Sequence, residues 1–415
     1  MKNPKIGIAF LLVSILSWFL YPLYGFVSNQ YEVARIPWGW HVLPNKPVPK
    51  EFVIDDDYAK ISQAALEILL RRRDRIAAPS LSAAVAVDRK IVFSGAVGWR
   101  DISKELPATP LTTYRIGSTS KPVGITSLAR LVDEGLIDLD SPISRYAKDL
   151  PNSAWGQLTA RQLASHTAGL PGYEENKDWL GFYQSLTLRA HYDDPKAALN
   201  VFDGSDLLHK PKSKFHYSSY DNILLSAVMQ EAAGKSFHSV MTSRVFTPLN
   251  LDSIKPDDRH DKNANHAVSY QSKGVTYKPW RDVNLSHKLA AGGYIATPSD
   301  LAILGGAWLN DDYISSNTRD EFWTPAKLED GSVNEQDYAL GFRKKSWEIA
   351  GVGQVTHLNH GGVSKGAQCW LMIIPEYNMT VAISTNRRTD EFFDFGDVYV
   401  DLLELFIPAS HSASH

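Results

Sequence analysis

Cysteine is nearly absent from this chain, since Cys369 is the only one among its 415 residues. A single cysteine excludes an internal disulfide framework and every cysteine-rich metal site. Because Cys369 lies in an apolar run at residues 369–374, we interpret it as a buried structural residue. His-Glu-x-x-His and His-x-His-x-Asp patterns are missing as well, so the sequence predicts neither a metal ion nor another cofactor.

An excess of positive charge is also lacking. The chain has 43 Lys and Arg residues against 46 Asp and Glu residues, a formal net charge of −3. It therefore carries no electrostatic signature of a nucleic-acid-binding protein. With 44% hydrophobic and 21% charged residues, its composition is typical of a folded globular protein and excludes a disordered or multi-span chain.

One long hydrophobic run is present, at residues 6–27, and it is long enough to cross a bilayer as a helix. Lys2 and Lys5 precede this run and no positive residue follows it directly. We therefore expect a single-pass membrane protein whose N-terminus is cytoplasmic and whose remaining chain lies outside, in the periplasm if the cell is Gram-negative. The alternative is a signal peptide whose cleavage releases the chain, but residues 23–27 offer no convincing cleavage site.

The rest of the chain predicts one α+β domain. Strand-like runs at residues 81–87 and 91–97 indicate a hairpin, and strand patterns return only near the other end of the chain. Helical patterns dominate between them. Strands from both ends of the chain would then complete one antiparallel sheet.

These patterns divide the chain into segments. Residues 1–31 are the expected anchor, and the proline-bearing residues 32–54 a stiff extended tether. The domain spans residues 55–407, and residues 408–415 form a loose tail. Within the domain we expect a helix-flanked antiparallel sheet with an inserted all-helical subdomain. The sheet part covers residues 55–120 and 290–407, and the insert covers residues 121–289.

Ser118 and Lys121 carry the predicted chemistry, and nowhere else does a serine stand three residues before a lysine. A helical pattern follows directly, so the two side chains share one helix face and lie within reach of each other. A serine hydroxyl is a poor nucleophile until a neighbouring base takes its proton. A buried lysine can be that base, because burial lowers its pKa.

Several segments around this pair resemble the serine β-lactamase and penicillin-recognising family. That family includes class C β-lactamases, D-Ala-D-Ala peptidases, esterases and mitochondrial serine β-lactamase-like proteins. The resemblance implies a β-lactamase/transpeptidase-like fold, with Ser118 and Lys121 as catalytic residues. It rests on residues 115–122 (RIGSTSKP), 135–142 (GLIDLDSP), 165–172 (SHTAGLPG) and 290–301 (AAGGYIATPSDL). By that likeness His166, in the third of these segments, is a framework histidine.

The second family motif, Tyr-x-Asn, fits this sequence in two registers. Tyr217 is followed by Ser219 in place of the asparagine, whereas Tyr220 and Asn222 match the letters three residues later. We favour Tyr217, because the leucine pair at residues 224–225 then has the family's spacing. A tyrosine beside the Ser-Lys pair would relay a proton to the leaving group.

His360, Gly361 and Gly362 resemble the third family motif. The likeness implies that the backbone N–H groups of Ser118 and Val363 form an oxyanion hole. It also implies that Ser219 and residues 360–362 contact the substrate. Motif two lacks the asparagine amide, and motif three lacks the cation and the hydroxyl. β-Lactam turnover in this family depends on these groups. We therefore expect a serine hydrolase for a small-molecule or peptide substrate, without efficient antibiotic hydrolysis.

Two other interpretations remain. Ser364 lies in a Gly-x-Ser-x-Gly pattern, but a strand is expected after it where an α/β-hydrolase needs a helix, so we treat this match as coincidence. The fold also permits a non-catalytic, membrane-tethered scaffold or peptidoglycan-binding protein that keeps the serine by descent. Intact Ser118, Lys121 and Tyr217 argue against the scaffold.

Overall fold

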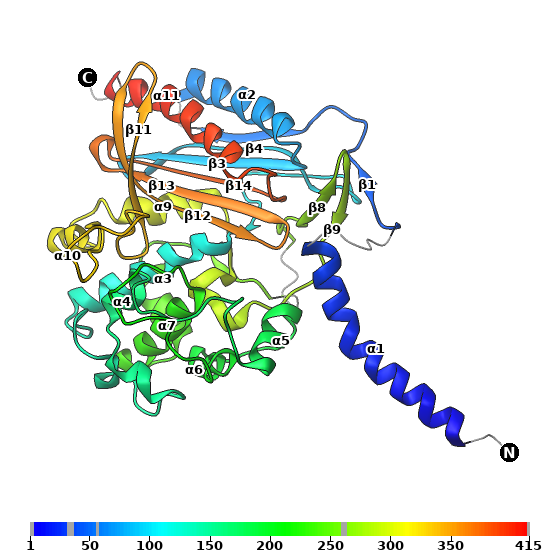
Figure 1. Ribbon diagram of the computed structural model, residues 1–415. Coiled ribbons are helices and arrows are strands. Elements are labelled where there is room, and N and C mark those ends of the chain that lie inside the picture. Colours follow the sequence, from blue (N-terminus) through cyan, green and yellow to red (C-terminus); the bar gives the residue numbers. More distant parts are fainter. Residues whose placement is uncertain (1–3, 31–36, 55–57, 259–263, 413–415) are drawn as a thin grey trace.

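An antiparallel eight-stranded sheet forms one half of the domain (Figure 1). The structure is a computed structural model that describes residues 4–30, 37–54, 58–258 and 264–412. The strand order is β11-β12-β13-β14-β3-β4-β2, and β5 adds to β4. Strands from both ends of the chain therefore meet in one sheet, which confirms the expected α+β architecture. The strands are β2 (Lys50–Ile54), β3 (Ser80–Val87), β4 (Lys90–Asp101), β5 (Leu106–Pro107), β11 (Arg343–Ile349), β12 (Gly353–Ser364), β13 (Ala367–Ile374) and β14 (Met379–Thr385).

The predicted hairpin is β3 and β4. Its turn residues Asp88 and Arg89 both have positive φ, 48° and 66°, as a tight two-residue hairpin turn requires. All of β3 is buried, and successive side chains point to opposite faces of the sheet. Ala84 belongs to the core beneath the sheet and Val85 to the core above it. Helices therefore have to cover both faces.

Helices α2 (Ala59–Arg75) and α11 (Gly396–Ser412) cover one face (Figure 1). Arg72 joins them through ion pairs to Asp397 and Asp401. Part of the expected loose tail is helical, because α11 runs through Pro408 to Ser412. The buried Ile407 explains this continuation, since the apolar face of the helix extends into the last turn.

The helical half lies against the other face (Figure 1). The expected insert at residues 121–289 is mainly helical, but it also carries a β-hairpin at Gly274. That hairpin belongs to a small sheet of order β1-β9-β8. The helices are α3 (Ser120–Asp133), α4 (Ala160–Ala164), α5 (Trp179–Thr187), α6 (Pro195–Ala198), α7 (Ser219–Ala233), α8 (Phe237–Met241), α9 (Pro298–Ala307) and α10 (Ser316–Phe322). The further strands are β1 (His41–Val42), β6 (Tyr114–Arg115), β7 (Lys255–Pro256), β8 (Tyr270–Lys273), β9 (Thr276–Pro279) and β10 (Tyr294–Ala296).

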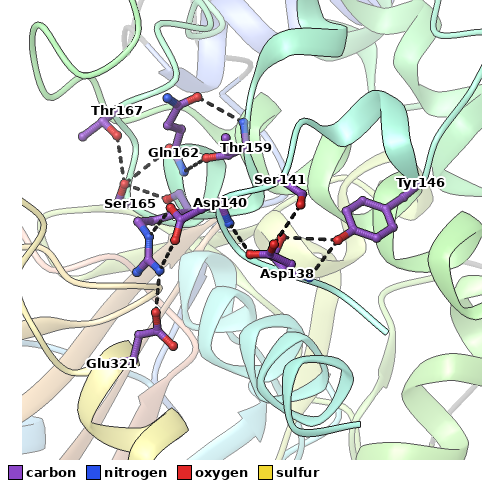
Figure 2. A network of polar contacts seen from close by, with 10 residues as sticks. Asp138, Asp140, Ser141, Tyr146, Thr159, Gln162, Ser165, Thr167 and Glu321 are labelled. Atoms are coloured by element: carbon purple, nitrogen blue, oxygen red, sulfur yellow. Dashed lines mark hydrogen bonds and ion pairs between the residues drawn. The ribbon is translucent and has the colours of Figure 1, made fainter. Parts of the chain in front are cut away.

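A polar network ties the segment at residues 135–142 to α4 and α10 (Figure 2). Asp138 accepts hydrogen bonds from the Asp140 backbone and the Ser141 hydroxyl. The Arg161 guanidinium donates two hydrogen bonds of 2.7 Å to Asp140 and also pairs with Glu321. These contacts order a loop within the helical half, so this family landmark has a structural part in the fold.

Helix α1 (Pro4–Gln30) is apolar and mostly exposed, and its residues Lys5–Ser28 have the length and composition to cross a membrane (Figure 1). It contacts α5, where the Tyr183 hydroxyl donates to the Phe19 carbonyl at 3.1 Å. Much of the segment that we expected to be an extended tether is instead paired into sheets. β1 pairs with β9 and β2 with the edge of β4, because an edge strand offers unpaired backbone groups. Residues 31–36 of the anchor and tether, 55–57 at the domain start and 413–415 of the tail lie outside the described residues.

Candidate active site

Ser118 lies on a short turn, Gly117–Thr119, between β6 and α3. Gly117 has a φ of 53°, which favours glycine, and a Cβ there would lie 2.5 Å from the carbonyl oxygen of Val363. Only glycine lets this turn approach β12 so closely. The turn holds Ser118 partly exposed at the start of α3, facing the end of β12.

Lys121 lies one helical turn later and is completely buried. Its Nζ is 3.3 Å from Ser118 Oγ and donates to the Ala291 carbonyl oxygen at 2.8 Å. Burial lowers the pKa of Lys121 to about 7, and the positive charges of Lys288 and Arg343 act in the same direction. Near neutral pH a large fraction of this amine is therefore uncharged.

The structure brings Tyr217 to this pair. Tyr217 lies just before α7 begins, and Lys121 Nζ is 4.7 Å from the centre of its ring. Burial raises the pKa of Tyr217 to about 12, and a hydrogen bond with Ser118 opposes that rise. Tyr220, the other register of the motif, instead stacks on Phe202 at 4.2 Å and takes a hydrogen bond from Asn176.

The backbones around Ser118 and Val363 are in close contact. A Cβ on Gly362 would lie 2.0 Å from the Ile116 carbonyl oxygen and 2.8 Å from the Ser118 nitrogen. A Cβ on Gly117 would lie 2.8 Å from the Val363 nitrogen. Glycines on both segments thus allow the two backbone amides to come together, at an edge where Val363 is partly exposed.

His360 is completely buried in β12. Its Nε2 lies 3.0 Å from the Tyr338 hydroxyl and its Nδ1 lies 2.8 Å from the Gly361 carbonyl oxygen. Burial lowers the pKa of His360 well below its ordinary value, so the imidazole is neutral. Tyr338 is also fully buried.

Ser219 and Gly361 lie beside the site. In the part of the chain that the structure describes, neither forms a hydrogen bond with Ser118. Ser219 is the first residue of α7 and is partly exposed. Gly361 packs against Phe392, whose ring a Cβ would approach to 2.5 Å. Ser364 ends β12, and β13 begins three residues later at Ala367, so no helix follows this serine.

Sequence reasoning did not find Arg343, Tyr338 or Asp221. Arg343 begins β11 and its Cζ lies 5.7 Å from the centre of the Tyr217 ring. No motif marks it, because only the pairing of β11 with β12 brings it to the site. Tyr338 likewise lies in a turn-rich segment without a signature.

His166 and Asp221 form a buried pair behind Tyr217. His166 Nδ1 lies 2.6 Å from Asp221 Oδ2, and the imidazole ring centre is 4.4 Å from that of Tyr217. Burial raises the pKa of Asp221 well above its ordinary value and lowers the pKa of His166 far below its own. The pair is therefore net neutral and shares one proton. This position fits a framework histidine that supports Tyr217.

Within the part of the chain that the structure describes, no group of three or more His, Cys, Asp or Glu side chains could hold a metal ion. The chemistry offered by the described site residues is an alcohol, a partly neutral amine, a phenol and paired backbone N–H groups. This combination is typical of acyl transfer to a serine.

The comparison with known families identifies the class of protein. The Beta-lactamase family model matches residues 67–405, which is most of the chain. The chain therefore belongs to the beta-lactamase family, a family of serine hydrolases, as the sequence motifs indicated.

Individual relatives are distant. The chain is 24% identical to the mitochondrial serine beta-lactamase-like protein of Homo sapiens over 428 residues, covering 83% of this chain and 76% of that protein. It is similar in structure to a D-amino acid amidase from Ochrobactrum anthropi SV3, with a TM-score of 0.68, 20% identity, and 84% and 99% of the two chains covered. An octameric penicillin-binding protein homologue from Pyrococcus abyssi gives a TM-score of 0.64 at 19% identity, covering 85% and 77%. These structural likenesses show a shared fold.

Gly362→Ala should destabilise the protein, because its new Cβ would meet backbone atoms that cannot rotate away. We expect a loss of about 1–3 kcal/mol in the free energy of unfolding, measured by urea titration. Gly204→Ala is the matched control, since its Cβ would have only an ordinary contact at 3.8 Å, and it should change stability by less than about 1 kcal/mol. Equal stability of the two variants would contradict the close approach of β12 to Ser118.

Proposed function

We propose that this protein is a membrane-anchored serine hydrolase in which Ser118 attacks an amide, peptide or ester carbonyl and becomes acylated. One observation carries this proposal: the buried Lys121 amine lies 3.3 Å from the Ser118 hydroxyl. An alcohol becomes an effective nucleophile when an adjacent base takes its proton. A lysine that is about half neutral at pH 7 can be such a base.

In the proposed mechanism Lys121 takes the proton of Ser118 as the new C–O bond forms. Tyr217 keeps its own proton at neutral pH, because its pKa is raised to about 12, and it lies beside the lysine. Tyr217 gives its proton to the leaving group as the bond to the carbonyl carbon breaks, and it takes up the proton that Lys121 accepted from Ser118. Water then attacks the acyl-enzyme carbonyl and gives a proton to Lys121, and Lys121 returns a proton to Ser118 Oγ as the acid product leaves.

The backbone N–H groups of Ser118 and Val363 are the proposed oxyanion hole. The glycine contacts that bring Gly117 and Gly362 against the facing backbone support this assignment. Fixed N–H donors aimed at a developing oxyanion usually supply a large share of acyl-transfer catalysis. Ser219, Gly361 and Gly362 would contact the substrate beside it. His360 is buried and neutral, and it would support the substrate-binding edge of β12 from behind rather than contact the substrate as a cation.

Amides and esters are the proposed substrates, in preference to β-lactams. The crystal structure of the D-amino acid amidase of similar fold is a complex with L-phenylalanine amide. Small amides are therefore reasonable substrates to test. Ser219 and the buried His360 leave motifs two and three without the amide and the exposed cation that the resemblance links to antibiotic turnover.

We further propose that α1 anchors the protein in a membrane, with its N-terminus in the cytoplasm and the catalytic domain outside. The exposed apolar surface of α1 supports this proposal. Its residues Lys5–Ser28 have the length and composition of a membrane span, and Phe10 and Trp18 are 75% and 65% exposed. Large apolar side chains on a helix of this length suit contact with lipid.

Labelling with a fluorophosphonate probe tests the nucleophile. We expect a probe adduct on the peptide that contains Ser118, and a loss of hydrolysis of at least about a thousandfold in Ser118→Ala. Ser364→Ala is the matched control and should keep both adduct and activity. A folded wild-type protein that forms no adduct at Ser118 would favour the scaffold interpretation, and an adduct at Ser364 would reverse the assignment.

The rate of acylation should depend on pH through Lys121. The lowered pKa makes the amine neutral, and thus active as a base, above about pH 7. A fluorophosphonate phosphonylates Ser118 with loss of fluoride and needs the same base, so this labelling should speed up about tenfold between pH 6 and pH 8 and then level off. Stopped samples analysed by mass spectrometry give this rate. A rate that is constant from pH 5 to pH 9 would exclude Lys121 as the base.

Extraction of membranes with alkaline carbonate tests the anchor. The full-length chain should stay in the membrane pellet with its N-terminal peptide intact. A Leu12→Arg/Leu16→Arg double variant should be released, because charged residues at the centre of a span are costly, about 3 kcal/mol each. Release of the wild-type chain, or an N-terminus cleaved after α1, would instead identify a signal sequence.

A further inference from the structure

A cleft of about 440 Å³ opens beyond Val363, on the side of β12 away from His360. Four residues separate His360 from Lys365, which lies in the turn after β12, and the stretch of strand from His360 to Ser364 alone spans about 13 Å. The cleft is therefore distinct from the position of the third family motif. Its walls include Tyr173, Trp280, Lys288, Lys365 and Arg388.

The cations of this cleft are not neutralised by the protein. Among the described residues, no carboxylate forms an ion pair with Lys288, Lys365 or Arg388. Asp390 is the one acidic residue in the lining, and its carboxylate is already paired with Arg387 at 2.7 Å. Lys288 and Lys365 instead face aromatic rings. Lys288 Nζ lies 5.3 Å from the centre of the Tyr173 ring, and Lys365 Nζ lies 4.7 Å from that of Phe26, in α1, and 5.4 Å from that of Trp280.

Lys365 experiences both burial and crowding by like charges. Burial, and to a smaller extent the charges of Lys288, Arg281 and Arg388, together lower its pKa to about 7, so about half of this amine is charged near neutral pH. An anion bound beside Lys365 would favour its ammonium form and offset the repulsion from the neighbouring positive groups.

The cleft lies next to the Ser118 site, because Val363 belongs to its lining. Lys288 stands three residues before Ala291, whose carbonyl oxygen holds Lys121. The Lys288 charge lowers the pKa of both Lys121 and Tyr217, so it acts across the space between them. Val363, at the start of the cleft, packs against Gly117.

We propose that this cleft binds an anionic group, a carboxylate or a phosphate, of the substrate whose carbonyl Ser118 attacks. This inference rests on the proposed function and adds a substrate class to it. Lys288 and Lys365 supply the charge, and the Tyr173 and Trp280 rings enclose the chain that links the anion to the carbonyl. The formal net charge of the whole chain is −3, so the overall charge of the protein would not itself attract an anion.

Binding to the full-length protein in detergent tests the proposal without requiring turnover. Isothermal titration of the Ser118→Ala variant would compare monomethyl glutarate with its neutral analogue methyl valerate, and methyl phosphate with methanol. We expect at least one anion to bind about tenfold or more tightly than its neutral analogue. Lys288→Met and Lys365→Met should each weaken that anion about tenfold, and added KCl should weaken it further.

Lys235→Met is the matched control, because Lys235 is exposed beyond the far end of α7 and should leave anion binding unchanged. The carboxylate and phosphate arms distinguish the two sources of charge. Binding of neither anion, or equal binding of anions and neutral analogues, would overturn the proposal. So would anion affinity that survives both cleft variants. Because Ser118 is absent from this assay, its outcome is separate from that of the labelling experiment.

Discussion

The burial of Lys121 beside Ser118 is the constraint on which the site depends. A lysine without solvent exposure would ordinarily destabilise a fold, since an ammonium ion loses its hydration there. Here the Ala291 carbonyl oxygen accepts one hydrogen bond from the amine at 2.8 Å, and burial favours the neutral form. The same burial that costs stability produces a base next to an alcohol. Stability and reactivity are thus coupled through one side chain.

The remaining structure keeps that amine enclosed and gives the alcohol an open side. Lys121 lies in the first turn of α3 and Ser118 in the short turn just before it, and β12 approaches their backbone through glycine contacts at Gly117 and Gly362. Behind Tyr217, the neutral His166–Asp221 pair fills space without adding net charge near the amine. The antiparallel sheet holds β12 between β11 and β13, so residues from distant parts of the sequence reach one place.

The parts of this site that depend on local spacing could be predicted from the sequence. Ser118 and Lys121 are one helical turn apart, and the β3–β4 hairpin follows from two adjacent strand patterns. Contacts between distant segments were harder to predict. Arg343 and Asp221 carry no motif, and β2 lies in a segment whose prolines indicated a tether. The enclosure of His360 depends on Tyr338, which reaches it only in the folded chain. Unpaired cations such as Lys365 are visible only once their neighbours are known.

The protonation state of Lys121 is the most direct test of this account. Proteins labelled with 13C at the lysine ε-carbon can be titrated by NMR, and the Lys121→Met variant identifies the signal. The account predicts a midpoint near pH 7, about three pH units below an ordinary lysine. A midpoint above pH 10 would mean that the amine remains an ammonium ion at neutral pH. In that case it could not take the proton of Ser118, and the central claim would be contradicted.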